Sequence, residues 1–266
     1  MQTDVGISFT DWSLHTSVVL GLIFLGGCYL LLIGPMRDRV SSIGEVSPKR
    51  AGSFFLGLFV VFVALNGPLH DLSDDYLFSA HMVQHLLLQL LMPPLLLLGL
   101  PQVTDVPMLS RLGLITFFRT MTNPIICFIT FNGVLVGWHL PPLYDFALQN
   151  HNVHIIQHLT FMFVGVLAWW PVLSPSSQLP RALFPIQIIY IFAQSIPMGF
   201  LGAAITFSGS LLYTHYVNAP RVWSISPLAD QQMGGLIMKS SAGLVFLLGL
   251  GLVFLAWFRH EENAQM

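Results

Sequence analysis

The chain has 266 residues, of which 55% are hydrophobic and only 8% are charged, and its formal net charge is −2. A soluble domain carries about a quarter charged residues, so the polar groups here are too few to cover a water-facing surface. This composition excludes an ordinary soluble protein, and the near-neutral charge without a basic cluster argues against nucleic acid as a partner. The two cysteines, Cys28 and Cys127, both lie in apolar stretches, which argues against a disulfide framework.

Seven apolar stretches are each long enough to cross a lipid bilayer, which takes about twenty residues. In chain order they are 14–34, 52–69, 77–100, 123–143, 154–173, 184–206 and 232–258. The first has no basic residue before it and is as long as a full span, so we expect a membrane span and not a cleaved signal peptide. Prolines at Pro93-Pro94, Pro141-Pro142 and Pro197 predict kinks and not breaks. The predicted fold is one all-α membrane domain over residues 1–266, a polytopic bundle of seven transmembrane helices.

Positive charges are divided unequally between the two faces of this predicted bundle. One face has only Arg221, whereas the other carries Arg37, Arg39, Lys49, Arg50, Arg111, Arg119, Arg181 and Arg259. Because basic loops stay in the cytoplasm, we expect the amino terminus outside and the carboxyl terminus in the cytoplasm. On this map nine of the ten histidines fall at the outer face, and only His260 is cytoplasmic. The outer face is therefore the predicted functional face.

A short string of residues recurs in three predicted outer loops. It reads Pro68-Leu69-His70-Asp71, Pro142-Leu143-Tyr144-Asp145 and Pro227-Leu228-Ala229-Asp230. Nine or ten residues beyond each aspartate stand His81, His154 and Lys239, respectively. We expect tandem two-helix repeats in one orientation, as in transporters with parallel repeats. The alternative is chance, since proline and aspartate are common at helix starts.

Two histidine pairs, His81/His85 and His154/His158, each begin a predicted span with the motif His-x-x-Gln-His. Residues at positions i and i+4 lie on one face of a helix, so each pair can bind one metal ion or line one polar cavity. His139, at the outer end of the fourth predicted span, can join them. These five histidines are the predicted metal ligands.

These residues do not determine which metal or cofactor is bound. Imidazole suits zinc, copper, iron and nickel, but no His-Glu-x-x-His motif supports zinc-dependent hydrolysis. A b-type haem is an alternative, because histidines from two helices can supply both axial ligands. A simpler alternative is hydrogen bonding between helices by the histidines with Gln84 and Gln157.

Lys239 lies seven residues beyond Gln232 in the last predicted span, about 10 Å along the helix, too deep to reach the outer surface easily. We expect it to face the bundle interior and to pair with Asp230, with Asp145 or with a bound anion. Together with the aspartates it would line a path in a copper or ion transporter. The single cytoplasmic histidine and the lack of a polar trail in the inner half argue against that function.

Seven stretches between residues 15 and 258 form a longer pattern: 68–74, 79–85, 93–94, 138–141, 144–145, 158–171 and 230–238. In order and spacing they resemble the CtaG family of caa3-type cytochrome c oxidase assembly factors. The resemblance implies a seven-span protein of the bacterial cytoplasmic membrane that is needed to make active cytochrome c oxidase and delivers copper to it. The polar motif positions that carry over are His81, Gln84, His85, His139, Asp145, His158, Asp230 and Gln231.

The sequence and the resemblance together predict a non-enzymatic assembly factor that binds copper, as Cu(I), in the outer half of the bundle. The predicted ligands are His81, His85, His139, His154 and His158, with Gln84, Asp145, Gln157, Asp230 and Lys239 as supporting polar groups. Nearby carboxylates, Asp145 in particular, would balance the charge of the ion. The predicted partners are cytochrome c oxidase subunits and the lipid bilayer, without nucleic acid. The alternatives are an electron carrier with b-type haem and a copper or ion transporter.

Overall fold

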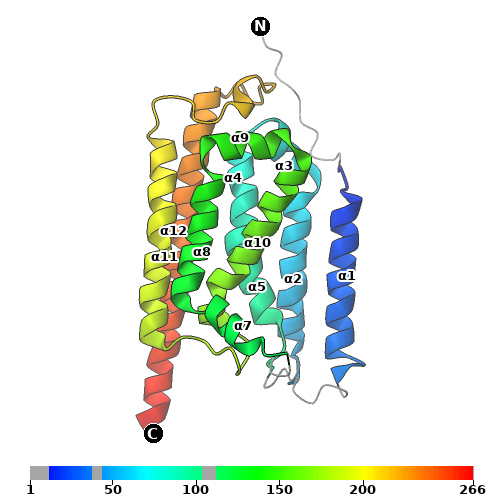
Figure 1. The fold of residues 1–266 in the computed structure, drawn as a ribbon, viewed down its shortest axis with the longest axis vertical. Coiled ribbons are helices and arrows are strands. Elements are labelled where there is room, and N and C mark those ends of the chain that lie inside the picture. The colour runs from blue at the N-terminus through cyan, green and yellow to red at the C-terminus, as the bar shows by residue number, and fades with distance from the viewer. Residues whose placement is uncertain (1–11, 38–43, 104–111, 266) are drawn as a thin grey trace.

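The structure is a computed structural model that describes residues 12–37, 44–103 and 112–265. Within these ranges the regular elements are helices, apart from one isolated bridge between Val103 and Ser176. Figure 1 shows the long helices side by side, with the short helices α3 (Gly67–Asp75) and α9 (Pro141–Gln149) across one end. This end is called the outer end below, after the prediction from the positive charges. Arg39 and Arg111, two of the predicted cytoplasmic charges, lie outside the described residues.

Six helices of the described chain are long and apolar enough to cross a membrane, and a bent pair makes up to seven. The six are α1 (Thr16–Ile33), α2 (Pro48–Leu65), the composite helix α4–η2–α5 (Phe78–Leu86, Leu87–Leu91 and Met92–Gly99), α10 (His151–Leu173), α11 (Phe184–Thr206) and α12 (Pro227–Gln265). The bent pair is α7 (Ile115–Met121) with α8 (Pro124–Trp138), at 61° to each other. A 3-10 turn, η3 (His215–Val217), lies in the connection before α12. The predicted all-α polytopic bundle is confirmed.

Two predicted spans were too long at their outer ends. The helix α2 ends at Leu65, because Asn66 is extended and Gly67 has a positive φ of 66°. The helix α8 ends at Trp138, and Pro141 begins α9 instead of kinking the span. Proline disfavours a helical residue before it and is well placed in a first turn. The recurring Pro-Leu-x-Asp strings therefore lie in α3, in α9 and at the start of α12, and not in loops.

The third span contains a π-helical turn, η2, which ends two residues before Pro93. Proline has no N–H to donate and its ring crowds the preceding turn, and a wider turn accommodates both effects. The turn also packs closely on α10, since a Cβ on Gly165 would lie 2.9 Å from the Gln89 carbonyl oxygen and from Pro93 Cγ. Glycine at this contact lets the two histidine-bearing helices approach each other.

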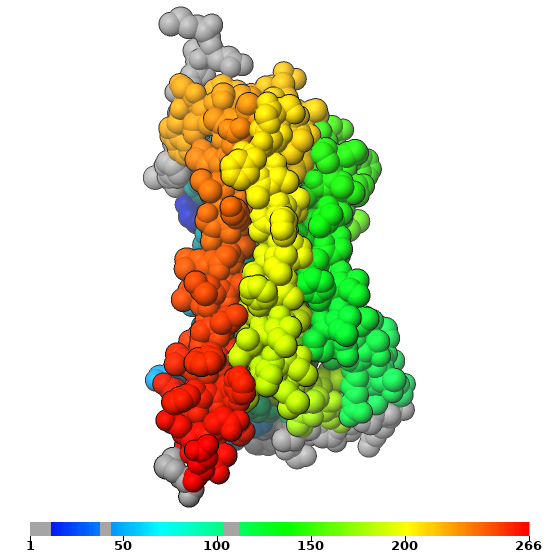
Figure 2. Space-filling view, turned by 90° about the vertical axis from the view of Figure 1, so that its left-hand side faces the viewer, coloured from blue at the N-terminus to red at the C-terminus, as the bar shows by residue number. Residues whose placement is uncertain are grey.

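Among the described helices, α11 and α12 have the most extensive contact, and they lie side by side next to α8 in Figure 2. A Cβ on Gly202 would lie 2.8 Å from the carbonyl oxygen of Gly235, so the two backbones touch. The outward faces are apolar: Phe163, Phe200 and Leu247 are exposed by 63%, 73% and 66%. Such a surface fits lipid and not water, in agreement with a multi-pass membrane protein.

Candidate metal centre

The five histidines that the sequence predicts as metal ligands lie together near the outer end of the bundle. His81 and His85 project from α4, His154 and His158 from α10, and His139 directly follows α8. Their exposed fractions are only 0%, 2%, 6%, 6% and 4%, respectively. The i, i+4 spacing brings each pair onto one helix face, and the packing of α10 against the third span brings the two faces together.

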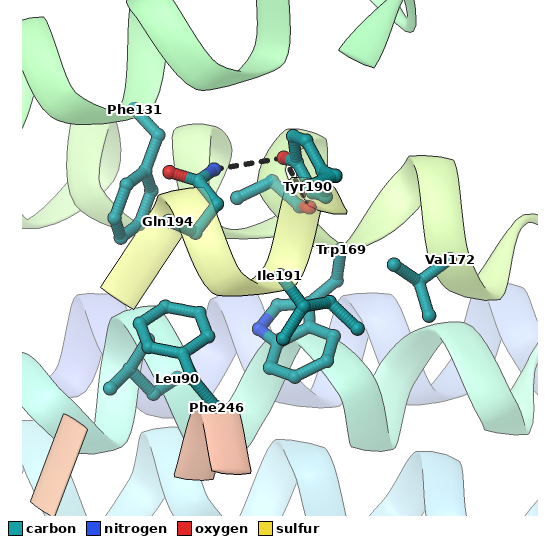
Figure 3. A pocket seen from close by; sticks show the side chains of 9 residues that line it. Leu90, Phe131, Trp169, Val172, Tyr190, Ile191, Gln194 and Phe246 are labelled. Atoms are coloured by element: carbon teal, nitrogen blue, oxygen red, sulfur yellow. Dashed lines mark hydrogen bonds between the residues drawn. The ribbon is translucent and has the colours of Figure 1, made fainter. Parts of the chain in front are cut away.

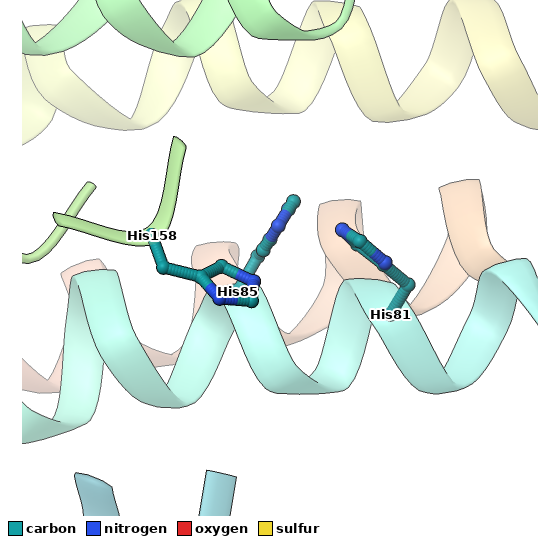
Figure 4. A group of neighbouring side chains, drawn as sticks. All are labelled: His81, His85 and His158. Carbon is teal, nitrogen blue, oxygen red and sulfur yellow. The ribbon is translucent and has the colours of Figure 1, made fainter. Parts of the chain in front are cut away.

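Three of these side chains form what we call the inner group: His81, His85 and His158. Each offers a ring nitrogen, and these three atoms lie within 4.8 Å of one another. Figure 4 shows His81 and His85 on one helix and His158 reaching in from its neighbour. The ring of His139 lies 5.9 Å from that of His85, at the edge of the group.

Most ring nitrogens of these histidines are buried without a hydrogen-bond partner among the described residues. They are both nitrogens of His85 and the Nε2 atoms of His81, His139, His154 and His158. A buried polar atom without a partner costs about 1–3 kcal/mol, and native proteins contain few of them. A neutral imidazole has one ring nitrogen with a lone pair that can bind a metal ion. The arrangement therefore fits a ligand that supplies the missing interactions.

A second set, the outer group, consists of Asp74, His81 and His154, whose ligating atoms also lie within 4.8 Å of one another. The Asp74 carboxylate lies 3.3 Å from Nδ1 of His154 and 3.5 Å from Nε2 of His70. His81 belongs to both groups, so the two share one imidazole. Sequence reasoning did not select Asp74 or His70 as site residues. Their i, i+4 spacing, the same signal that marked the histidine pairs, would have found them once residues 67–75 were assigned to a helix.

The charge of Asp74 is retained despite its position. Burial raises the pKa of this carboxyl, but the hydrogen bond with His154 and the nearby imidazoles of His70 and His81 outweigh burial and hold the pKa below its ordinary value. Burial lowers the pKa of His70, and the Asp74 carboxylate only partly offsets this. The outer group thus places an ionised carboxylate beside the imidazoles of His81 and His154.

The two predicted glutamines lie beside the histidines in different ways. Gln84 donates from Nε2 to the carbonyl of Ala64 at 2.8 Å and contacts Nδ1 of His70 at 3.0 Å. Gln157 is fully buried, and neither of its amide atoms has a partner among the described residues. Gln84 therefore orients His70, whereas Gln157 adds two further unpartnered atoms to the same region.

The predicted carboxylates Asp145 and Asp230 bind backbone groups and belong to neither group. Asp145 accepts hydrogen bonds from the backbone and hydroxyl of Thr214, and Asp230 accepts from the backbone of Phe78 at 2.7 Å and of Ser79 at 3.2 Å. Each aspartate ties one helix end to a distant segment. In this structure the carboxylate that lies among the histidines is Asp74, whereas Asp145 binds the connection before α12.

The prediction that Lys239 faces the bundle interior is wrong. Its side chain is exposed on α12, and Nζ lies 5.9 Å from the ring centroid of Phe207, at the outer end of α11. Helical side chains lean toward the amino end of their helix, which for α12 is the outer end, so the long aliphatic stem reaches outward. No ion pair of Lys239 occurs within the described residues.

Deeper in the bundle lies a polar network that sequence reasoning missed. Asn132 donates to Gln194 at 2.6 Å, Gln194 donates to the Tyr190 hydroxyl at 2.8 Å, and this hydroxyl donates to the Ala168 carbonyl at 2.7 Å. Figure 3 shows Gln194 and Tyr190 beside an apolar cavity of about 10 Å³, room for roughly one water. The network is internally bonded and small, unlike a transport path.

Comparison with known proteins identifies both a family and related chains. A family profile described as cytochrome c oxidase caa3 assembly factor matches residues 27–260. An uncharacterized protein of Mycobacterium leprae is 26% identical over 280 aligned residues, which cover 96% of this chain and 40% of its own length. Uncharacterized proteins of Mycobacterium bovis and Mycobacterium tuberculosis are each 27% identical over 205 residues, or 70% of this chain and 31% of theirs. The chain thus spans less than half the length of these curated relatives, and no solved structure matches it.

Proposed function

The chain belongs to the family of cytochrome c oxidase caa3 assembly factors, and on this basis we propose that it binds Cu(I) among its buried histidines and supplies the ion to an oxidase subunit. The observation that carries the proposal is the inner group. Three imidazoles from two helices offer nitrogens within 4.8 Å of one another, and most of these nitrogens have no other partner within the described parts of the chain. Imidazole is a good ligand for copper.

Electrostatics support a monovalent ion at this place. A charged group in a helix bundle is costly unless it is paired, and neutral imidazoles carry no charge to repel a cation. The Asp74 carboxylate in the adjacent outer group supplies one negative charge. The function is storage and transfer and not catalysis, and it would take place in the bacterial plasma membrane, where the oxidase is assembled.

The test is the copper content of the purified protein in lipid nanodiscs after incubation with Cu(I) and removal of free ion. We expect stoichiometric copper in the wild type and in His260→Ala, a control at the opposite end of α12, and none in His81→Ala/His85→Ala. Absence of copper from the wild type would refute the proposal. If the double variant retains as much copper as the wild type, the copper site lies outside the inner group.

A second candidate is an electron carrier with b-type haem. One observation favours it: a cavity of about 590 Å³ lies against α10, with His154 and His158 in its wall. Haem bound by histidine in this cavity would show a strong Soret absorption band in the purified protein. A protein without this band and with bound copper supports the first proposal.

A further inference from the structure

The burial of the histidines changes gradually from one side of the bundle to the other. His81 and His85 are at most 2% exposed, and His154 and His158 are each 6% exposed. His15 and His70 are half-buried, and His151 is exposed. The side on which exposure rises is the side where α1, α2 and α10 meet.

On this side lies the cavity of about 590 Å³, which we call the lateral cavity. Its outer part is lined by His15, His70, His151, His154 and His158, and its deeper part by apolar side chains such as Leu25, Met162 and Phe163. The lateral cavity therefore reaches both histidine groups, through His158 of the inner and His154 of the outer group.

The end face above the histidines is closed by three buried tyrosines, Tyr144, Tyr213 and Tyr216. The Tyr216 hydroxyl donates to the Ser73 carbonyl at 2.6 Å, and the Tyr213 hydroxyl donates to the His139 carbonyl at 3.0 Å. These bonds tie the connection before α12 to the ends of α3 and α8. Access from the end face would require these bonds to break.

The segment before α1 holds His15 in place at the mouth of the lateral cavity. The backbone N–H of His15 donates to Asn66 Oδ1 at 2.8 Å, and the Ser13 hydroxyl donates to Asp71 at 2.6 Å. The ring of His15 consequently lies 4.4 Å from that of His70. Imidazoles thus follow one another from the mouth of the cavity to the outer group.

We propose that copper enters from the side, through the lateral cavity, past His70, and that the outer group forms a position from which the ion passes to the inner group. This inference rests on the proposed copper function. His81 belongs to both groups, so the ion can gain an inner ligand before it releases Asp74. Only metal–ligand bonds form and break, and copper stays Cu(I). Carboxylate suits this soft ion less than imidazole does, so the equilibrium favours the inner group.

The first arm of the test measures the rate at which Cu(I) moves from a coloured chelate complex to the protein in nanodiscs, and the final occupancy. We expect Asp74→Asn and His70→Ala to load about tenfold more slowly and still to reach the wild-type occupancy at saturating Cu(I). His85→Ala, which removes an inner ligand, stays below that occupancy instead. This division separates a residue on the path from a residue that retains the ion.

The second arm blocks the lateral cavity with a matched pair of substitutions on α1. Gly21 lines the cavity, and an added Cβ there meets no atom of the described residues within 4 Å. A Cβ added to Gly27 on the same helix would be equally free of contacts with the described residues, and Gly27 does not line the lateral cavity. We expect Gly21→Phe to load more slowly than the wild type and Gly27→Phe to load at the wild-type rate.

The outcomes separate the two proposals. A wild type that takes up no Cu(I) overturns the proposed function and this route with it. A wild type that binds Cu(I) while Asp74→Asn, or Gly21→Phe, loads at the wild-type rate overturns the route and leaves the inner copper site standing.

Discussion

Two polar clusters are buried in the same helix bundle, and they differ in how many of their polar atoms have hydrogen-bond partners. Asn132, Gln194 and Tyr190 bond to one another, and only Asn132 Oδ1 lacks a partner among the described residues. Around the inner group, six imidazole nitrogens lack one. The first cluster contributes to stability, whereas the second costs stability in the absence of a ligand. Proteins retain such a cost mainly where a site needs it for function.

The largest effect expected from this comparison concerns His85, because both of its ring nitrogens lack partners among the residues that the structure describes. We expect His85→Leu to weaken Cu(I) binding by about a hundredfold or more. The copper-free variant should melt at the wild-type temperature or above it, because an unsatisfied polar group gives way to an apolar one. Competition with a Cu(I) chelator and thermal unfolding in nanodiscs measure the two quantities. A clear drop in melting temperature would contradict the view that this cluster costs stability.

The satisfied cluster should behave in the opposite way. Gln194→Leu leaves the Asn132 amide and the Tyr190 hydroxyl each short of one partner. We expect a loss of about 1–2 kcal/mol in stability and unchanged copper affinity. Ser195→Ala, on the exposed side of the same helix turn, is the control for thermal unfolding. Weaker copper binding in Gln194→Leu would show that the two clusters are coupled.

A smaller effect is expected at Asp230, which satisfies the first backbone N–H groups of the helix that carries His81 and His85. Loss of such a cap costs about 1 kcal/mol, so Asp230→Ala should lower the melting temperature and weaken copper binding severalfold. Asp145→Ala is the matched control, because it releases Thr214 and not α4. Equal copper affinity in the two variants would mean that the start of α4 does not position the ligands.

The smallest effect is expected at Lys239, which belongs to neither cluster. We expect Lys239→Met to change stability by less than about 0.5 kcal/mol and to leave copper binding unchanged, because its charge lies on the lipid-facing side near Phe207. Chelator competition and thermal unfolding check both. Loss of copper uptake in this variant would instead support an ion path that includes Lys239 on α12.

Patterns local in the sequence predicted most of the fold and part of the site. Apolar stretches located the spans, and the i, i+4 spacing placed His81 with His85 on one face. Spacing along one helix does not show which residue of another helix lies opposite, so the contact with Asp74 emerged only from the packed structure. The prediction for Lys239 was wrong because it considered only the depth of the residue along the helix. It did not consider the direction in which a helical side chain leans. Helix α9 was missed because its prolines were read as a kink.

The π-helical turn at 87–91 has a consequence for the register of the third span. One inserted residue rotates everything beyond it by roughly 100° about the helix axis. Before the turn, His81 and His85 face the histidines of α10, and beyond it Pro93 packs against Gly165 of the same helix. In a regular helix the histidine face and the face that contains Pro93 would point in different directions. The extra residue in the turn rotates the second face toward α10 as well. Both the histidines before the turn and the packing surface beyond it are thereby directed toward α10.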